Sequence, residues 1–319
     1  MPRDNGLNSL KAIQERFSDP EAAVSPQLLR RLQRDPRAGA AKLYQSLLRR
    51  WKQQCDENRR LDAMLHFERV LWKAGISRIA GVDEVGIGPL AGPVVAAAVV
   101  FPPGVDIDGI NDSKQLDAPT RERLDKEIRA KASGIGIGIV EIEEIDRINI
   151  YHAGIRAMQL AISGLPDPPQ HVLVDSRAIP DLPLPQNSFD KGDGINFSIA
   201  SASIVAKVYR DRVMTELDSI YPGYGFADHK GYATPVHQRA IQELGPCGIH
   251  RKSFDYIREL CGKYSALYYE LKAQSATVRA RNAMAEWEKR LKASKSELSP
   301  MEYKKMQMTA RRLWKRISH

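Results

Sequence analysis

Two adjacent carboxylates, Asp83 and Glu84, interrupt the otherwise apolar stretch "IAGVDEVGIGPLAGPVVAAAVVFP" of residues 79–102. Neighbouring residues on a strand point to opposite faces, so both acids cannot enter one core unless the strand ends there. Gly86 and Gly88 follow at once, and glycines within a strand pattern indicate a bend or an end. Two carboxylates at a strand end can bind a hard divalent cation, for which magnesium with its preference for oxygen ligands is the natural candidate.

Two further acids follow later in the same part of the chain. Asp175 ends the apolar run "HVLVD", and Asp193 lies between two glycines in "FDKGDG". Taken singly, each has an ordinary interpretation as a helix cap or a turn residue. Four acids at the strand ends of one domain repel one another unless a cation holds them, so the set favours a metal site.

The elements that must position these acids belong to an α/β pattern. Short β-rich runs alternate with helical stretches, which predicts a layered α/β or α+β domain. The run "QHVLVDS" is apolar enough to predict a strand buried on both faces. The predicted strands cover 78–85, 92–102, 134–142 and 170–176, and the predicted helices cover 119–132, 198–220 and 234–245.

Helical segments flank this pattern on both sides. Before it, residues 26–74 predict paired helices, with N-caps at Ser25 and Asp35, each followed by proline. After it, residues 262–319 predict helices with a capping box at Ser299. The predicted domains are therefore a helical N-terminal extension (1–77), an α/β domain (78–261) and a basic helical C-terminal extension (262–319).

The charge of the chain is unevenly distributed. Residues 1–77 carry 15 Lys and Arg against 9 Asp and Glu, and residues 262–319 carry 14 against 5, whereas residues 78–261 carry 19 against 25. Basic ends favour a polyanionic partner, although solvated helix surface is the equally open alternative.

Composition also limits the setting of the protein. No apolar run reaches the roughly 18 residues of a membrane span, and the N-terminus has no apolar signal segment, so we expect a cytoplasmic protein. Three cysteines without Cys-x-x-Cys spacing predict ordinary thiols rather than a zinc site.

Six motifs together resemble the bacterial ribonuclease HII family in order and spacing, over roughly residues 78–258. They are "AGVDEVGIGPLAGPVVAAAVV", "NDSKQL", "VLVDS", "KGDGINFSIASASIVAKVYRDR", "YPGYGFADHKGYATPVH" and "GIHRKSF". The segment before residue 78 also resembles the N-terminal extension of some bacterial members, whereas residues 262–319 do not resemble the family core.

The resemblance implies a ribonuclease H-like mixed sheet flanked by helices. It implies an endonuclease that cuts the RNA strand of RNA–DNA hybrids, and also cuts 5′ of single ribonucleotides in duplex DNA, leaving 3′-hydroxyl and 5′-phosphate ends. It places the metal ligands, and thus the catalytic acids, at Asp83, Glu84, Asp175 and Asp193, with two Mg²⁺ or Mn²⁺ ions. We expect a monomer. Some members of the family bind a replication clamp through a terminal motif, but no clear clamp-binding peptide is visible in this sequence.

The resemblance also implies substrate contacts. Gly86-Ile87-Gly88 is similar to a glycine–basic–glycine loop that reads the ribose 2′-hydroxyl, and Tyr232 to a tyrosine that stacks on the next sugar. Expected phosphate contacts are Lys114, Lys207, Arg210 and Lys230. Ile87 departs from the pattern because members usually carry Arg or Lys there, which leaves open an alternative: a hybrid-binding protein with weakened cleavage or lost junction specificity.

Overall fold

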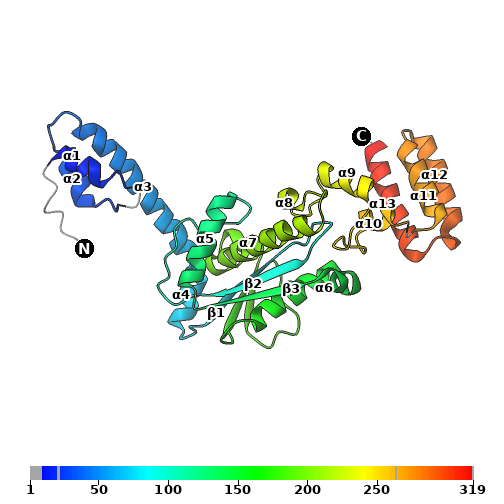
Figure 1. Ribbon diagram of the computed structural model, residues 1–319, viewed down its shortest axis with the longest axis horizontal. Coiled ribbons are helices and arrows are strands. Elements are labelled where there is room, and N and C mark those ends of the chain that lie inside the picture. The colour runs from blue at the N-terminus through cyan, green and yellow to red at the C-terminus, as the bar shows by residue number, and fades with distance from the viewer. Residues whose placement is uncertain (1–8, 20–21, 263, 318–319) are drawn as a thin grey trace. The chain divides into compact units, whose positions relative to one another are not determined.

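The structure is a computed structural model that describes residues 9–19, 22–262 and 264–317 (Figure 1). Its centre is a five-stranded sheet of order β3-β2-β1-β4-β5. β1 runs antiparallel to β2 and parallel to β4, and β4 runs parallel to β5, so the sheet is mixed as predicted. The strands are β1 (Ile79–Val85), β2 (Val94–Val100), β3 (Gly134–Val140), β4 (His171–Asp175) and β5 (Gln186–Phe189).

The apolar strands are buried as their composition predicts. Every residue of β2, and the first four residues of β4, are buried. Strands covered on both faces read as continuous apolar runs rather than as alternating ones. β5 was not predicted, because its sequence "QNSF" has neither β-branched residues nor an apolar alternation.

Long helices cover the sheet. α5 (Ala118–Lys131) and α7 (Phe197–Ile220) contribute to a core with β2, while α6 (Ile142–Ser163) was not among the predicted helices. The first turn of α7 lies very close to β1. A Cβ atom on Gly81 of β1 would come within 2.1 Å of the carbonyl carbon of Ser198. Only glycine permits this approach, which brings α7 against the strand that carries Asp83.

The N-terminal part of the chain is helical, as predicted. It consists of α1 (Leu10–Arg16), α2 (Pro26–Gln33), α3 (Ala40–Met64) and α4 (His66–Lys73). Ser25 caps α2 by accepting a hydrogen bond from the amide of Leu28, which confirms the predicted start. The predicted start at Asp35 is wrong: α3 begins at Ala40, because the Asp35 carboxylate accepts hydrogen bonds from the backbone and guanidinium of Arg37 instead.

The C-terminal part contains three helices with a core of their own. These are α11 (Ala266–Thr277), α12 (Arg281–Ala293) and α13 (Pro300–Ile317). Their shared core includes Leu271, Met284 and Trp287. The predicted capping box is present: Glu302 N donates to Ser299 Oγ over 3.3 Å, and Ser299 N donates to Glu302 Oε2 over 2.7 Å. Before these helices lie α8 (Phe226–His229), α9 (Pro235–Leu244) and α10 (Asp255–Leu260).

The chain divides into two compact units. The first comprises residues 1–85, 95–139 and 155–209, and the second comprises 86–94, 140–154 and 210–319. Each unit combines segments that are far apart in the sequence, whereas the predicted domains are three consecutive segments. The predicted boundaries 1–77, 78–261 and 262–319 therefore stay a prediction. Within the described part of the chain, no helix has the length and apolar character needed to cross a membrane.

Candidate active site

The ends of two parallel neighbouring strands bring Asp83 and Asp175 to one edge of the sheet. Val82 of β1 is paired with Val174 of β4, so the next residue on each strand is an acid. Asp83 is only 5% exposed, and the residue paired with it on the neighbouring strand β2 is the small residue Ala97. Glu84 follows on the opposite face and is partly buried. The sheet therefore places carboxylates where the sequence predicted a strand-end site.

Asp193 joins this edge through a short turn. It lies in the 3-10 turn η1 (Gly192–Gly194) and is 5% exposed. The amide of Gly192 donates to Asp175 Oδ1 over 2.6 Å, which ties the turn to the end of β4. Lys114 Nζ lies 3.0 Å from Asp193 Oδ2, so the predicted phosphate contact Lys114 is at this edge as well.

The ordinary interpretation of Asp193 as the cap of the following helix does not hold. The side chain of Asn196 takes that role, because the amide of Ile199 donates to Asn196 Oδ1 over 3.0 Å. Asp193 is bound to Lys114 instead. Asp175 likewise caps no helix; its second oxygen accepts a hydrogen bond from the hydroxyl of Ser176.

The acids act on one another electrostatically. Burial raises the pKa of Asp83 well above its usual value, and the charges of Glu84, Asp175 and Asp193 raise it further against a hydrogen bond from Ser203. Burial, and then the charge of Asp175, also raise the pKa of Glu84. Such repulsion opposes ionisation of the cluster, whereas a bound cation would favour it.

This donor set fits a hard divalent cation. All four predicted ligands offer carboxylate oxygens, which Mg²⁺ and Mn²⁺ accept. In the described residues, no three acidic, histidine or cysteine side chains are gathered tightly enough to enclose an ion as they stand. One oxygen of Asp193 is paired with Lys114, and one oxygen of Asp175 accepts from the amide of Gly192. A carboxylate can accept such a hydrogen bond and ligate a metal ion at the same time.

The glycine loop that follows β1 belongs to the second compact unit. Gly86 has a φ of +97°, and a Cβ atom there would lie 2.5 Å from Arg210 Nε, so no other residue fits. Ile87 and Tyr232 are 37% and 41% exposed. A Cβ atom on Gly88 would be 3.8 Å from the Tyr232 ring, so the predicted substrate contacts Gly88 and Tyr232 are neighbours.

Two buried arginines hold this loop by its carbonyl groups. Arg251, which is 0% exposed, donates to the carbonyls of Gly86, Ile87, Pro89, Gly92 and Pro93 at 2.6–3.2 Å. Arg210 is also 0% exposed, and it donates to Pro93, Lys230 and Ala91 at 3.0–3.1 Å. Their shared task is to fix the shape of the loop.

The structure gives Arg210 a role that the sequence did not indicate. Its guanidinium donates to three backbone carbonyls inside the protein, and its predicted contact with a phosphate stays a prediction. Arg251 was missed as a functional residue, although it lies in the recognised motif "GIHRKSF". A buried arginine is rare, and only the unusual run of glycines and prolines at 86–93, with many carbonyls and few side chains, could have signalled a need for internal donors.

The other predicted cations differ in their surroundings. Lys230 Nζ donates to Thr215 Oγ1 over 2.7 Å and to the carbonyl of Ala227 over 2.6 Å. Lys207 is half-buried on α7. His237 and His250 are buried with their Nε2 atoms 3.1 Å apart, and burial lowers the pKa of each to about 4. These two histidines are neutral structural residues at neutral pH.

Comparison with known proteins decides the family. Residues 80–257 match the family described as Ribonuclease HII, and residues 9–72 match its N-terminal domain. The chain belongs to the ribonuclease HII family. Ribonuclease HII of Anaeromyxobacter sp. (strain Fw109-5) is 47% identical over 261 residues, which are 82% of this chain and 83% of that protein. Ribonuclease HII of Myxococcus xanthus (strain DK1622) is 49% identical over 255 residues, 80% of this chain and 87% of that protein.

A solved structure agrees with the fold. The ribonuclease H2 of Pyrococcus horikoshii OT3 superposes with a TM-score of 0.51 at 26% identity, covering 58% of this chain and 98% of that one. The fold and family predicted from the motifs are thus confirmed. Membership of the ribonuclease HII family makes the chain an enzyme, a hydrolase of the ribonuclease H class that acts as an endonuclease on RNA–DNA hybrids.

Proposed function

We propose that this protein cuts 5′ of single ribonucleotides embedded in duplex DNA, as well as within longer RNA–DNA hybrids, and leaves 3′-hydroxyl and 5′-phosphate ends. The observation that carries the proposal is the convergence of Asp83, Asp175 and Asp193 at one sheet edge in a ribonuclease HII chain. Removal of misincorporated ribonucleotides from DNA, in the cytoplasm, is the corresponding cellular role.

The carboxylates serve to hold metal rather than to attack the substrate. When bound, two Mg²⁺ or Mn²⁺ ions would supply an activated water and charge stabilisation of the leaving 3′ oxygen. Asp83 and Glu84 on β1, with Asp175 and Asp193, provide the oxygen ligands. Lys114 neutralises Asp193 and offers an ammonium for the phosphate backbone, where contacts position the duplex without reading its sequence.

Recognition of the ribose belongs to the glycine loop. Without side chains at Gly86 and Gly88, a sugar can approach the backbone, and the 2′-hydroxyl can both donate to and accept from backbone groups. The half-exposed ring of Tyr232 lies beside Gly88 and is suited to stack on the following sugar. Lys207 and Lys230 add candidate phosphate contacts.

A second candidate function rests on Ile87. Its side chain is 37% exposed. It carries no charge, whereas the resemblance to the family leads us to expect Arg or Lys at this position. If that charge is needed at the junction, the protein binds hybrids but cleaves them weakly or without junction preference.

A cleavage assay separates the two functions. With magnesium and end-labelled duplex DNA holding one ribonucleotide, we expect a single cut 5′ of that ribonucleotide and none in all-DNA duplex. Cleavage of an all-RNA hybrid alone would mean that the loop has lost junction reading. Binding without cleavage of either substrate would favour the second function.

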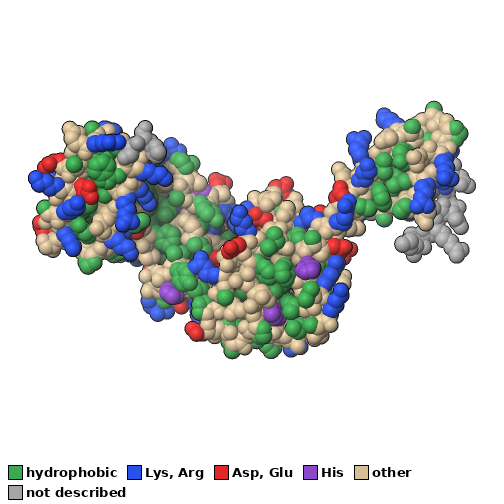
Figure 2. Space-filling view, turned by 180° about the vertical axis from the view of Figure 1, so that it is seen from behind, with side chains coloured by type: hydrophobic (Ala, Val, Ile, Leu, Met, Phe, Trp, Pro, Cys, Tyr) green, Lys and Arg blue, Asp and Glu red, His purple; other side chains and the backbone are tan. Residues whose placement is uncertain are grey.

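The C-terminal helices 262–319 are proposed to add duplex affinity. Figure 2 shows Lys and Arg side chains over these helices, and α13 exposes Lys304, Arg311 and Lys315 at helical spacing along one face. Cations that neutralise phosphates make affinity strongly salt-dependent.

Deleting residues 262–319 is therefore expected to weaken binding more than it slows bond cleavage. Replacing Lys304, Arg311 and Lys315 with Gln should lower the slope of log affinity against log salt by about 0.9 for each lost phosphate contact. Fluorescence anisotropy of a labelled duplex across a salt series measures this, with Gln307→Ala on the same helix as control. An unchanged slope would show that this face is ordinary solvated surface.

A further inference from the structure

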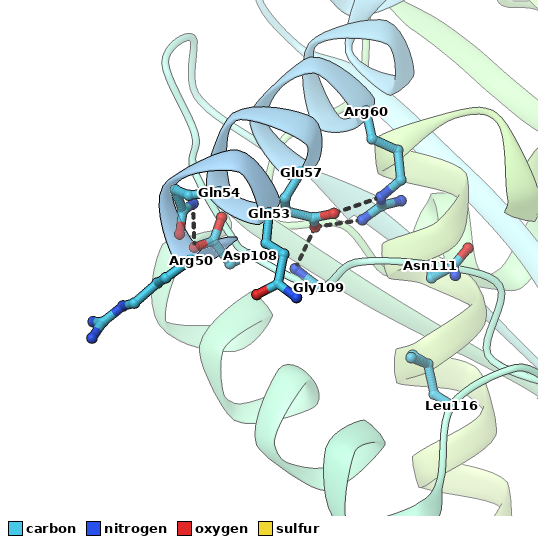
Figure 3. Close-up of a pocket in the computed structure, with 9 residues that line it drawn as sticks. All are labelled: Arg50, Gln53, Gln54, Glu57, Arg60, Asp108, Gly109, Asn111 and Leu116. Atoms are coloured by element: carbon cyan, nitrogen blue, oxygen red, sulfur yellow. Dashed lines mark hydrogen bonds and ion pairs between the residues drawn. The ribbon is translucent and has the colours of Figure 1, made fainter. Parts of the chain in front are cut away.

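Two side chains of helix α3 form hydrogen bonds with the backbone of the loop that leads to Lys114. Glu57 Oε1 accepts a hydrogen bond from the amide of Gly109 over 2.9 Å (Figure 3). Arg60 Nη2 donates to the carbonyl of Ile110 over 2.7 Å. The two side chains also form an ion pair at 2.6 Å. They lie beside an open pocket of about 450 Å³ between α3 and this loop.

This loop, residues 109–114, continues directly into the predicted active site. Four residues after Ile110, Lys114 pairs with Asp193 over 3.0 Å. Ser113, next to it, shares a 2.9 Å hydrogen bond with Ser203, which in turn hydrogen-bonds Asp83. A shift of the loop at Gly109 and Ile110 would therefore move groups that touch two of the four acids.

Helix α4 holds the segment that carries Asp193, the ion-pair partner of Lys114. Glu68 is buried, and its carboxylate accepts from the amide of Ser198 over 3.0 Å and from Asn196 Nδ2 over 3.1 Å. Asn196 follows Asp193 by three residues, so this contact anchors the segment that carries Asp193. Burial raises the pKa of Glu68, but these donors oppose the shift.

We propose that Glu57, Arg60 and Glu68 are positioning residues for the active site. From the helices before the sheet, they hold the two segments that carry Lys114 and Asp193, and so set where the lysine meets the acid cluster. None of the three touches a predicted metal ligand, so their effect is exerted through the backbone of residues 109–114 and 196–198. The consequence for catalysis rests on the proposed function, whereas the mechanical role does not.

Glu57→Gln tests whether helix α3 holds residues 109–114 in place, with Asp56→Asn as its matched control. Asp56 is the adjacent acid on α3, and it pairs with Arg59 on the exposed side of the helix. In the unaltered protein, Arg60 Nε donates to Glu57 Oε2 over 2.8 Å. Glutamine keeps the acceptor for Gly109 but places an amide donor opposite Arg60 Nε, so that this hydrogen bond is lost. We expect faster hydrogen exchange at residues 109–116 in the full chain, and no change there for Asp56→Asn.

A metal titration gives the second measurement. Outer partners of a metal site typically change metal affinity 10–100-fold, so these more distant residues should raise the Mg²⁺ concentration for half-maximal cleavage by about 3–10-fold. Mg²⁺ binding by calorimetry should move in parallel. Glu68→Gln is expected to do the same while raising exchange at residues 193–199.

The outcomes are distinct. Exchange at 109–116 equal in Glu57→Gln, Asp56→Asn and the unaltered chain, at equal melting temperature, overturns the positioning role. Faster exchange with an unchanged Mg²⁺ response overturns its link to the metal site. If the chain cleaves no substrate at all, the proposed function fails, but the exchange and calorimetry still decide the inference.

Discussion

Asp83→Asn is expected to abolish cleavage while making the metal-free protein more stable. The carboxylate is buried beside three other acids, and its loss removes a ligand at the centre of the site. Metal-bound charge stabilisation is worth several kcal/mol, so a loss of about 10³-fold or more in rate is expected. Rates under single-turnover conditions, with saturating Mg²⁺, measure this loss.

The gain in stability should depend on pH. The folded-state pKa of Asp83 is raised above its value of 3.8 in the unfolded chain. A raised pKa means that the fold favours the protonated acid, so its stabilising contribution is complete below pH 3.8 and is lost as pH rises through the folded-state pKa. The melting temperature of Asp83→Asn should therefore increasingly exceed that of the unaltered protein as pH rises above 3.8.

The control for this comparison is Asp167→Asn, an exposed loop acid in the same compact unit. It should change neither cleavage nor the pH profile of melting. Undiminished turnover in Asp83→Asn would remove this residue from the mechanism. A melting difference that stays constant with pH would contradict the buried, repelled state of its carboxylate.

The residues that end apolar strands could be predicted from the sequence because two independent signals met there. Burial explains the run "HVLVD", and the acid that ends it became a predicted metal ligand because three other acids share the pattern. Helix starts were readable where capping was local, as at Ser25 and Ser299. At Asp35 the same signal failed, because Arg37 competed for the carboxylate.

The missing parts depended on contacts distant in sequence. β5 has no apolar pattern of its own and is a strand because β4 offers it a free edge. Arg210 and Arg251 look like surface cations in the sequence, and burial of such residues is uncommon. Apart from Lys230, their partners are carbonyls of residues 86–93, more than one hundred residues away in the chain, which no local pattern reveals.

Arg251→Lys is expected to impair junction cleavage more than cleavage of a continuous hybrid. Lysine keeps the positive charge but has three donors, where Arg251 serves five carbonyls of the glycine loop. Each buried carbonyl left unpaired costs about 1–3 kcal/mol, so the loop should adopt other shapes. A misplacement of about 1 Å can cost 10²-fold in rate, and this loss should fall on the substrate that depends on one 2′-hydroxyl.

The measurement is the ratio of rates on a single-ribonucleotide duplex and on an all-RNA hybrid. Arg239→Lys, the same change at an exposed position on α9, should leave that ratio unaltered. Melting temperature and exchange at residues 86–93 separate a loosened loop from general unfolding. Equal loss on both substrates would assign Arg251 to stability alone. A selective loss would mean that ribose recognition depends on how the loop backbone is held from within, which explains how Ile87 can replace a cation while Gly86, with its φ of +97°, cannot change.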